Sequence, residues 1–243
     1  VNPLIGSAPL EDLSLYGGPD YDPDPKDMGF SGLVYPGATL PHGIVKLSPL
    51  TEMIYPEPHY GWTHGSGYYY PDNTIVGFAH TNKGHWNAGN IPIIPTVGKL
   101  QIAPGTSDNP EGGFRSRFSH ERESARAGYY SVYLQDYDVQ AELTATCYVG
   151  FHRYTFPKTS DGHIIIDLSH AIESVDHAAV EIIDDQHIKG VQNEVYFYAS
   201  FSKPFMSYGT WEYGKVTPRS RSASGDNIGA YVDYQTGEGE QIG

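Results

Sequence analysis

The segment from Ser119 to Phe156 decides the fold class, and it reads S-H-E-R-E-S-A-R-A-G-Y-Y-S-V-Y-L-Q-D-Y-D-V-Q-A-E-L-T-A-T-C-Y-V-G-F-H-R-Y-T-F. Apolar and polar side chains alternate in two runs, 130–134 and 139–146, which are separated by residues 136–138. A period of two in neighbouring runs predicts adjacent antiparallel strands, each with one face buried. The segment therefore indicates a β-sheet protein.

Turn-forming residues occur throughout the chain. The 243 residues include 28 Gly and 18 Pro, which leave little room for long helices. Only residues 168–179 have helical character, and this run is short. Many short strands between turns predict an all-β fold, a two-sheet antiparallel β-sandwich. Strands are expected at 35–48, 92–103, 128–135, 138–148, 150–156, 163–168, 180–190, 194–202 and 228–235.

The charge of the chain excludes some partners. Its net charge is −14, from 15 basic and 29 acidic residues, and no basic stripe is available to neutralise phosphates. No apolar run is long enough to span a membrane. We therefore expect neither a nucleic-acid nor a membrane partner.

Motifs for metal binding and thiol chemistry are weak. The acidic run 20–27 has Asp at alternate positions, but its prolines, the missing glycine and the missing closing Glu argue against a calcium loop. The 11 histidines form no H-x-H or H-E-x-x-H pair. The single cysteine, Cys147, lies in a strand pattern and is expected to be a small buried apolar group.

Six separated blocks of sequence carry a resemblance to a known family. They are V-N-P-L-I-G at 1–6, Y-P-G-A-T-L-P-H-G-I-V-K-L-S-P at 35–49, S-G-Y at 66–68 with T-I-V-G-F-A-H-T at 74–81, I-I-P-T-V-G at 93–98, the 119–156 segment, and I-I-I-D-L at 164–168. In this order they resemble the amino-terminal domain of the exo-α-mannosidases of glycoside hydrolase family 92. The resemblance covers most of the chain and fades after about Asp176.

The resemblance implies a particular domain organisation. Residues 1–243 are expected to form the amino-terminal β-sandwich, a supersandwich like that of galactose mutarotase, without its last strand. Residues 7–34 are expected to be an insertion loop. In the family a larger helical (α/α)6 catalytic domain follows. That domain supplies both catalytic carboxylates and most of the calcium site, so no catalytic residue and no metal ligand is expected in this chain.

The resemblance implies that the domain takes part in glycan degradation. The resemblance indicates a calcium-dependent, inverting exo-α-mannosidase that hydrolyses terminal α-mannosides, with this domain shaping the leaving-sugar site and packing on the catalytic domain. We expect secretion to the periplasm or the cell exterior, because Val1 is not an initiator Met and a signal peptide is the natural segment to have been removed. A stand-alone carbohydrate-binding β-sandwich and a purely structural domain remain as alternatives.

Two segments supply the predicted substrate-binding residues. Trp62 stands at the family's leaving-sugar tryptophan, although an indole there is equally consistent with a core position. The stretch 80–90, H-T-N-K-G-H-W-N-A-G-N, supplies His80, His85, Trp86 and Asn90, with Asn90 where the family usually has Asp. A loop rich in Gly, His, Asn and Trp on a rigid scaffold suits sugar contact, whereas the alternative is a simple turn.

Three residues are predicted to support the site or the domain interface. Glu121 is expected to be a buried carboxylate on a strand, accepting from the backbone or an arginine and positioning its loop against the catalytic domain. Glu142 and Arg153 are expected to belong to the same network. Tyr148 replaces an arginine that is usual in the family, which removes a fixed cation from a possible interdomain contact.

Overall fold

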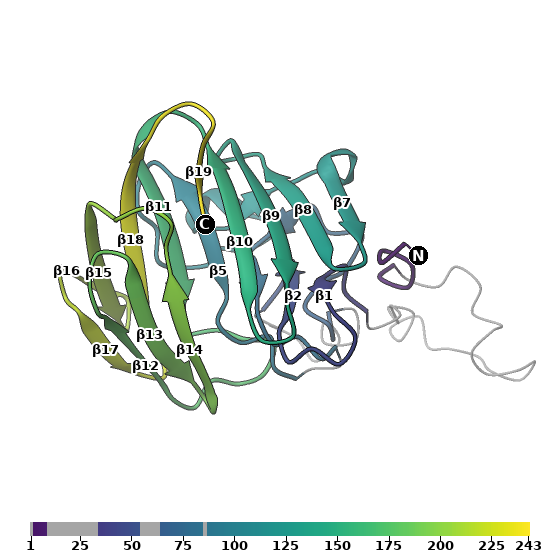
Figure 1. The fold of residues 1–243 in the computed structure, drawn as a ribbon, viewed down its shortest axis with the longest axis horizontal. Helices are drawn as coiled ribbons and strands as arrows, with labels where there is room; N and C mark the ends of the chain where they lie inside the picture. The colour runs from purple at the N-terminus through teal and green to yellow at the C-terminus, as the bar shows by residue number, and fades with distance from the viewer. Residues whose placement is uncertain (1, 9–33, 54–63, 85–86) are drawn as a thin grey trace, which may run out of the picture.

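The computed structural model describes residues 2–8, 34–53, 64–84 and 87–243, and the regular elements of these residues are strands and two short 3₁₀ helices (Figure 1). The strands are β1 (Ala38–Thr39), β2 (Lys46–Leu50), β3 (Thr74–Ile75), β4 (Gly77–Ala79), β5 (Ile93–Val97), β6 (Ser116–Arg117), β7 (Glu123–Arg126), β8 (Tyr129–Leu134), β9 (Val139–Ala145), β10 (Gly150–Phe156), β11 (Thr159–Asp167), β12 (Ala178–Ile182), β13 (His187–Gln192), β14 (Val195–Ser200), β15 (Ser207–Glu212), β16 (Lys215–Pro218), β17 (Ser222–Gly225), β18 (Ile228–Thr236) and β19 (Glu240–Ile242). The 3₁₀ helices are η1 (Pro110–Gly112) and η2 (His120–Arg122).

Most of the strands form a two-layer sandwich, and β3 pairs with β6 in a separate two-stranded sheet. One layer is an eight-stranded antiparallel sheet in the order β1-β2-β4-β5-β11-β18-β15-β16. The other layer consists of a five-stranded sheet, β19-β10-β9-β8-β7, and a four-stranded sheet, β14-β13-β12-β17 (Figure 1). Strand β9 packs over β1, β2 and β5, whereas β12 and β17 pack on β18. The predicted all-β sandwich is confirmed, although the division of its second layer into two sheets was not predicted.

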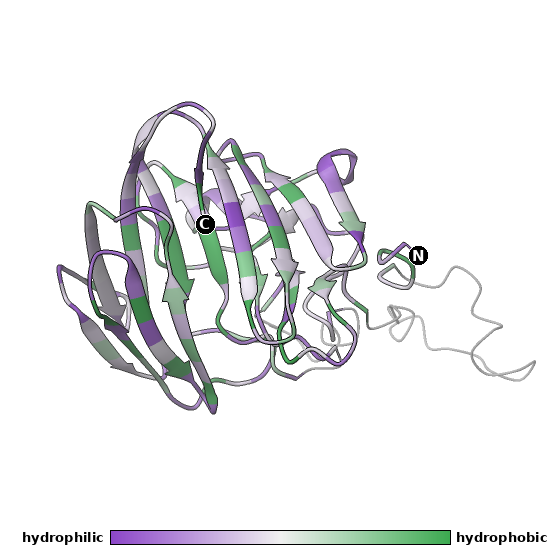
Figure 2. Ribbon diagram, viewed as in Figure 1, coloured by the Kyte–Doolittle hydropathy of each residue, from purple (hydrophilic) through white to green (hydrophobic). Residues whose placement is uncertain are grey.

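The core lies between the layers and follows from the alternation of apolar side chains. In β11 the I-I-I run is buried on both faces, with Ile165 paired to Ile94 of β5 and to Tyr231 of β18. Phe78 of β4 packs on the rings of Tyr130 and Tyr154, which belong to the opposite layer. Figure 2 shows hydrophobic bands alternating with polar ones along the strands. Each large apolar side chain buried in this way stabilises the fold by about 1.5–3 kcal/mol.

Glycine permits close aromatic packing elsewhere on the eight-stranded sheet. Trp211 of β15 is 2 % exposed, and it pairs with Gly229 of β18. A β-carbon at Gly229 would overlap the indole ring, and Tyr231 covers Gly209 in the same manner. The two aromatic rings therefore lie against glycine backbone and bury it.

Several predicted boundaries need correction. The range 180–190 is not one strand but parts of β12 and β13, because Asp184 accepts a hydrogen bond from the Gln186 N–H and closes a turn. The range 35–48 likewise contains two strands, β1 and β2, and the strand expected at 92–103 ends at Val97.

The run 168–179, whose sequence has helical character, does not form a helix. Asp167 accepts from the Ser169 N–H at 2.8 Å and from His170 Nδ1 at 2.7 Å, which turns the chain locally. An irregular segment follows, and β12 begins at Ala178. The described residues contain no helix that is long and apolar enough to cross a membrane.

Candidate functional site

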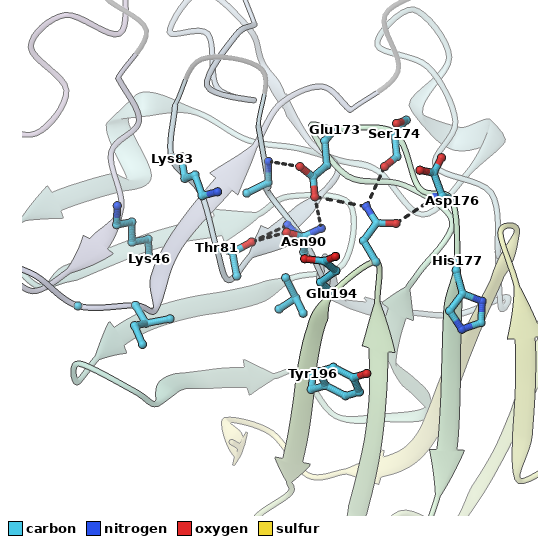
Figure 3. Close-up of a pocket in the computed structure, with 15 residues that line it drawn as sticks. Lys46, Thr81, Lys83, Asn90, Glu173, Ser174, Asp176, His177, Glu194 and Tyr196 are labelled. Carbon is cyan, nitrogen blue, oxygen red and sulfur yellow. Dashed lines mark hydrogen bonds between the residues drawn. The ribbon is translucent and has the colours of Figure 1, made fainter.

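A cleft of about 1030 Å³ lies where loops from both layers meet the start of β14 (Figure 3). It is lined by Gly43, Ile44, Lys46, Thr81, Lys83, Ala88, Asn90, Glu173, Ser174, Asp176, His177, Asn193, Glu194, Val195 and Tyr196. These residues come from four separate parts of the sequence, which only the folded sandwich brings together. The cleft is large enough for a small oligosaccharide.

Asn90 ties the floor of the cleft together. Its Oδ1 accepts from Thr81 Oγ1 at 2.7 Å, and its Nδ2 donates to Glu173 Oε1 at 3.0 Å. The same Glu173 oxygen accepts from Asn193 Nδ2 at 3.3 Å, and Oε2 accepts from the Ala88 N–H at 3.0 Å. Asn90 itself is fully buried. The floor is therefore a cross-linked polar network that holds three loops in a fixed arrangement.

Glu173 is the anchored anion of this network. Burial by itself raises the pKa of Glu173, but the hydrogen bonds from Asn90 and from the Ala88 N–H outweigh it, so the pKa lies below its usual value. The carboxylate stays ionised at neutral pH and already accepts three hydrogen bonds. It is thus suited to fixing the floor rather than to donating a proton.

The rim of the cleft has a basic and an acidic side. In Figure 3 Lys46 and Lys83 lie on one side of the cleft, and Asp176 lies on the other. Glu194 adds a further exposed carboxylate. Ammonium groups and carboxylates placed opposite each other donate and accept hydrogen bonds around a shared space, which suits a neutral ligand that carries many hydroxyl groups.

A chain of neutral groups lies directly behind the cleft. His80 Nδ1 bonds the Ile91 carbonyl at 2.8 Å, and its Nε2 lies 3.0 Å from Nε2 of His152. His152 Nδ1 lies 2.7 Å from the hydroxyl of Tyr154. Because a carbonyl only accepts, His80 must carry its proton on Nδ1; His152 then donates from Nε2 and accepts from Tyr154.

This arrangement requires both histidines to be neutral. Burial lowers the pKa of His80 to about 4, although the bond to the Ile91 carbonyl opposes the shift. Burial also holds the pKa of His152 well below its usual value, and the neighbouring His80 adds to the effect. In these tautomers a proton added to His80 would point two N–H donors at each other across 3.0 Å, and a proton added to His152 would remove the acceptor that Nδ1 offers to the Tyr154 hydroxyl.

An exposed apolar patch adjoins the cleft. It consists of Leu40, Ile44, Tyr148, Val149 and Phe151, whose exposed fractions range from 38 % for Leu40 to 77 % for Tyr148. The Ile44 N–H bonds the Cys147 carbonyl, which places the loop before β2 beside the turn between β9 and β10. Because Ile44 also lines the cleft, a partner covering this patch would extend one wall of the cleft.

Comparison with known proteins places the chain in a family. Its sequence matches the Glycosyl hydrolase family 92 N-terminal domain over residues 1–243. The chain belongs to that family. A solved family 92 α-mannosidase from Bacteroides thetaiotaomicron, in complex with mannoimidazole, is 30 % identical, with a TM-score of 0.83 over 100 % of this chain and 31 % of its own. A family 92 inverting mannosidase from Bacteroides thetaiotaomicron VPI-5482 shares the fold, at 24 % identity and a TM-score of 0.76 over 100 % of this chain and 30 % of its own.

The family 92 domain is much shorter than these relatives. It spans about a third of the solved mannosidase chains. An uncharacterized secreted glycosidase from Arthroderma benhamiae is 26 % identical over 173 residues, which cover 63 % of this chain and 20 % of that protein. The activity of the whole protein is therefore proposed below rather than taken from these relatives.

Of the residues predicted to contact substrate, only some line the cleft in the described part of the chain. Asn90 lines the cleft, whereas His80 points away from it toward His152. Neighbouring residues of an extended segment face opposite ways, so Thr81 takes the position on the cleft that was expected for His80. Trp62, His85 and Trp86 lie outside the described residues, and their sugar-binding roles stay predictions.

Glu121 is not the buried carboxylate that was expected. It lies in η2 rather than on a strand, and its side chain is exposed. The buried carboxylate is Glu123, which accepts from Tyr68 and Tyr130 hydroxyls and lies 2.6 Å from Nδ1 of His120. The S-x-x-x-E spacing around the turn, with its serine cap, places the second glutamate inside.

Glu142 and Arg153 form a pair of their own. Arg153 donates from two nitrogens to the two Glu142 oxygens, at 2.7 and 2.8 Å, across the β9–β10 pair. Tyr129 donates to the same carboxylate at 2.7 Å. Arg153 is 54 % exposed, so the pair braces the surface of the five-stranded sheet and lies apart from the Glu123 network.

Sequence reasoning missed most of the cleft. Lys83 and Thr81 lie within the H-T-N-K stretch already singled out, but Glu173, Asp176 and Asn193 come from segments that were not. The E-S-V-D-H sequence at 173–177 is polar and follows a buried strand, which was the available signal for a loop. The helical character of 168–179 obscured that signal.

Proposed function

We propose that the chain is the amino-terminal domain of a calcium-dependent, inverting exo-α-mannosidase that removes terminal α-mannose from glycans. The observation that carries the proposal is the family match over all 243 residues together with the 30 % identical α-mannosidase structure that aligns with the entire chain. The mannoimidazole complex of that relative supports a mannose-like ligand. Secretion is part of the proposal, and the name of the fungal relative supports it.

The cleft would shape the leaving-sugar side of the active site. Its rim offers donors from Lys46 and Lys83 and acceptors from Asp176 and Glu194, which suit sugar hydroxyls. The floor fixed by Asn90 and Glu173 would keep these groups in place during turnover, so that positioning contributes to the rate.

The apolar patch supports an (α/α)6 catalytic domain as partner. Four of its side chains, those of Ile44, Tyr148, Val149 and Phe151, are about half or more exposed, which is costly for a lone domain. The solved relatives contain about twice as much further chain as this domain. A helical domain seated on the patch would complete the cleft and supply the acid and base, which inverting hydrolysis needs on opposite sides of the sugar with room for a water.

Calcium would be bound mainly by that partner domain. Among the described residues, no group of three or more His, Cys, Asp or Glu side chains is placed to hold a metal ion. The cleft carboxylate Glu173 is already occupied by three protein donors. The ion would bind sugar hydroxyls in the completed site, and the residues of this domain would orient the leaving sugar beside it.

A release assay on the complete gene product tests the proposal. The protein is incubated with mannobiosides of α-1,2, α-1,3, α-1,4 and α-1,6 linkage, with and without a chelator, and the anomer released first is followed by NMR. We expect release of β-mannose from at least one linkage and loss of activity with the chelator. Residues 1–243 alone should give no turnover.

Two results would overturn it. A folded complete gene product that cleaves none of these mannosides is not an α-mannosidase of this kind. Initial release of α-mannose would contradict the inverting mechanism, since inversion at an α-linkage gives the β-anomer.

A further inference from the structure

A second hollow, of about 530 Å³, lies on the outer face of the four-stranded sheet. Its floor is a row of paired residues that crosses four strands: Tyr196 of β14 faces Val191 of β13, Val191 faces Ala179 of β12, and Ala179 faces Ser224 of β17. Paired residues share a face of the sheet. The row places small side chains beside one large ring, which leaves a shallow depression next to the tyrosine.

The adjacent row is polar and is also continuous across the sheet. Tyr198 faces Lys189, Lys189 faces Glu181, and Glu181 faces Ser222. Lys189 Nζ lies 2.9 Å from Glu181 Oε2, and both side chains are about half exposed. The pair thus presents ammonium donors and carboxylate acceptors at the rim of the hollow, and Glu212 adds a further carboxylate.

The two tyrosines are presented to solvent on the same side. Tyr196 is 82 % exposed and Tyr198 is 64 % exposed, and residues two apart on a strand lie about 7 Å from each other. Tyr198 packs on the ring of His187 with 5.6 Å between ring centroids, and Asp184 holds His187 through Nδ1 at 2.8 Å. Tyr198 is therefore restrained before any ligand binds, which lowers the entropic cost of binding.

This combination of features selects a class of ligand. An apolar ring face with hydroxyl groups around its edge can stack on a tyrosine while it exchanges hydrogen bonds with Lys189, Glu181 and the serine hydroxyls. A polyanion is disfavoured by the net charge of −14. We propose that this face binds a neutral oligosaccharide, with adjacent sugar rings on Tyr196 and Tyr198, in a surface site that adjoins the cleft at Tyr196.

The surface site does not rest on the proposed mannosidase function, because its residues are complete within the four-stranded sheet. Tyr196 lines both the hollow and the cleft, and it is the residue through which one glycan could extend from one to the other. Tyr198 and Ala179 do not line the cleft, so they can be altered to test the surface site alone.

Affinity electrophoresis of the complete gene product provides the test, in native gels that contain α-mannan, a β-glucan or a galactan. We expect retardation by at least one polysaccharide. Tyr198→Ala should weaken that binding about tenfold, through loss of the stacked ring. Ala179→Arg should weaken it by filling the floor. Met206→Ala removes another exposed apolar side chain, away from this sheet face, and should leave binding unchanged.

Three results would overturn the surface site. They are no retardation by any of the polysaccharides, retardation that all the variants share, and a concentration-dependent dimer that Ala179→Arg abolishes while no glycan binds. The last result would assign the face to a second copy of the chain. Turnover of a small aryl α-mannoside is measured in parallel: binding that depends on Tyr198 without any turnover keeps the surface site and refutes the mannosidase proposal.

Discussion

Changing Asn90 to Asp is an isosteric perturbation with a large expected effect. In the native cleft the Asn90 amide donates to Glu173 at 3.0 Å, and its oxygen accepts from Thr81. Asp keeps the second contact but replaces the donor with an oxygen. The substitution thus removes one hydrogen bond and places two carboxylates in contact within a buried network.

The magnitude follows from two terms. Loss of a hydrogen bond to a charged group costs about 1.5–3 kcal/mol. Two charges about 4 Å apart repel by about 4 kcal/mol at an effective dielectric constant of about 20, but proton uptake by the pair limits this cost. We therefore expect Asn90→Asp to lower the free energy of unfolding by about 3 kcal/mol at pH 7.

The pH dependence gives the sign of the electrostatic part. In the variant the folded pair holds a proton that the unfolded carboxyl groups release above about pH 4.5. The loss of unfolding free energy caused by Asn90→Asp should therefore grow as pH rises above that value and shrink as pH falls toward it. Urea unfolding of the variant and of the native protein between pH 4.5 and 7.5 measures both quantities.

Asn109→Asp is the matched control. Asn109 is exposed at the start of η1, so the same added charge should change stability by less than about 0.5 kcal/mol. Equal effects of the two substitutions, or a deficit at Asn90 that does not vary with pH, would refute the assignment of Asn90 as the donor that holds Glu173.

Three further predictions concern the core and the leaving-sugar site. The pKa of His80 is about 4 in the folded protein and about 6.5 in the unfolded chain, so its full contribution to the free energy of unfolding is present above pH 6.5 and up to about 3 kcal/mol is lost as pH drops to 4. Urea unfolding of His152→Gln should show a weaker dependence of this free energy on pH, and an unchanged dependence would contradict the histidine chain. Gly229→Ala should displace the Trp211 ring and lower the free energy of unfolding by about 2–4 kcal/mol, whereas a loss below about 0.5 kcal/mol would show that the ring does not lie against that glycine. Trp62→Ala in the complete gene product should reduce kcat/KM on a natural mannobioside by about tenfold or more and on a small aryl mannoside much less, and equal losses would indicate a folding role.

The sequence was sufficient to predict strand positions where the side-chain period matched a sheet with one buried face. The alternation in 119–156 predicted β8, β9 and β10 nearly to the residue, with the break at 136–138 as their turn. The strand predicted at 163–168, around the I-I-I-D-L block, matches the second half of β11. Short strands such as β3 and β6, of two residues each, carry too little pattern to be recognised, because their pairing is decided by distant partners.

The cleft was less predictable because contacts across long sequence separations build it. Asn90 was identified from its loop, but its partner Glu173 is 83 residues away, and no local pattern joins them. Glu121 and Glu123 differ only in which side of a serine-capped turn they occupy. A strand period of two places both glutamates on one face and cannot choose between them. The η2 turn leaves Glu121 exposed, whereas the Glu123 side chain is buried at the start of β7.

The most direct test of the account is a comparison of two substrates on cleft variants of the complete gene product. Lys83→Ala and Glu194→Ala remove an exposed cation and an exposed carboxylate that line the cleft, and Lys99→Ala removes an exposed lysine that does not line it. If the cleft holds the leaving sugar, both rim variants lose about tenfold in kcat/KM on the preferred mannobioside and less than about twofold on an aryl mannoside, while Lys99→Ala matches the native protein. Rim variants that match Lys99→Ala on both substrates would contradict the assignment of this cleft to the leaving sugar.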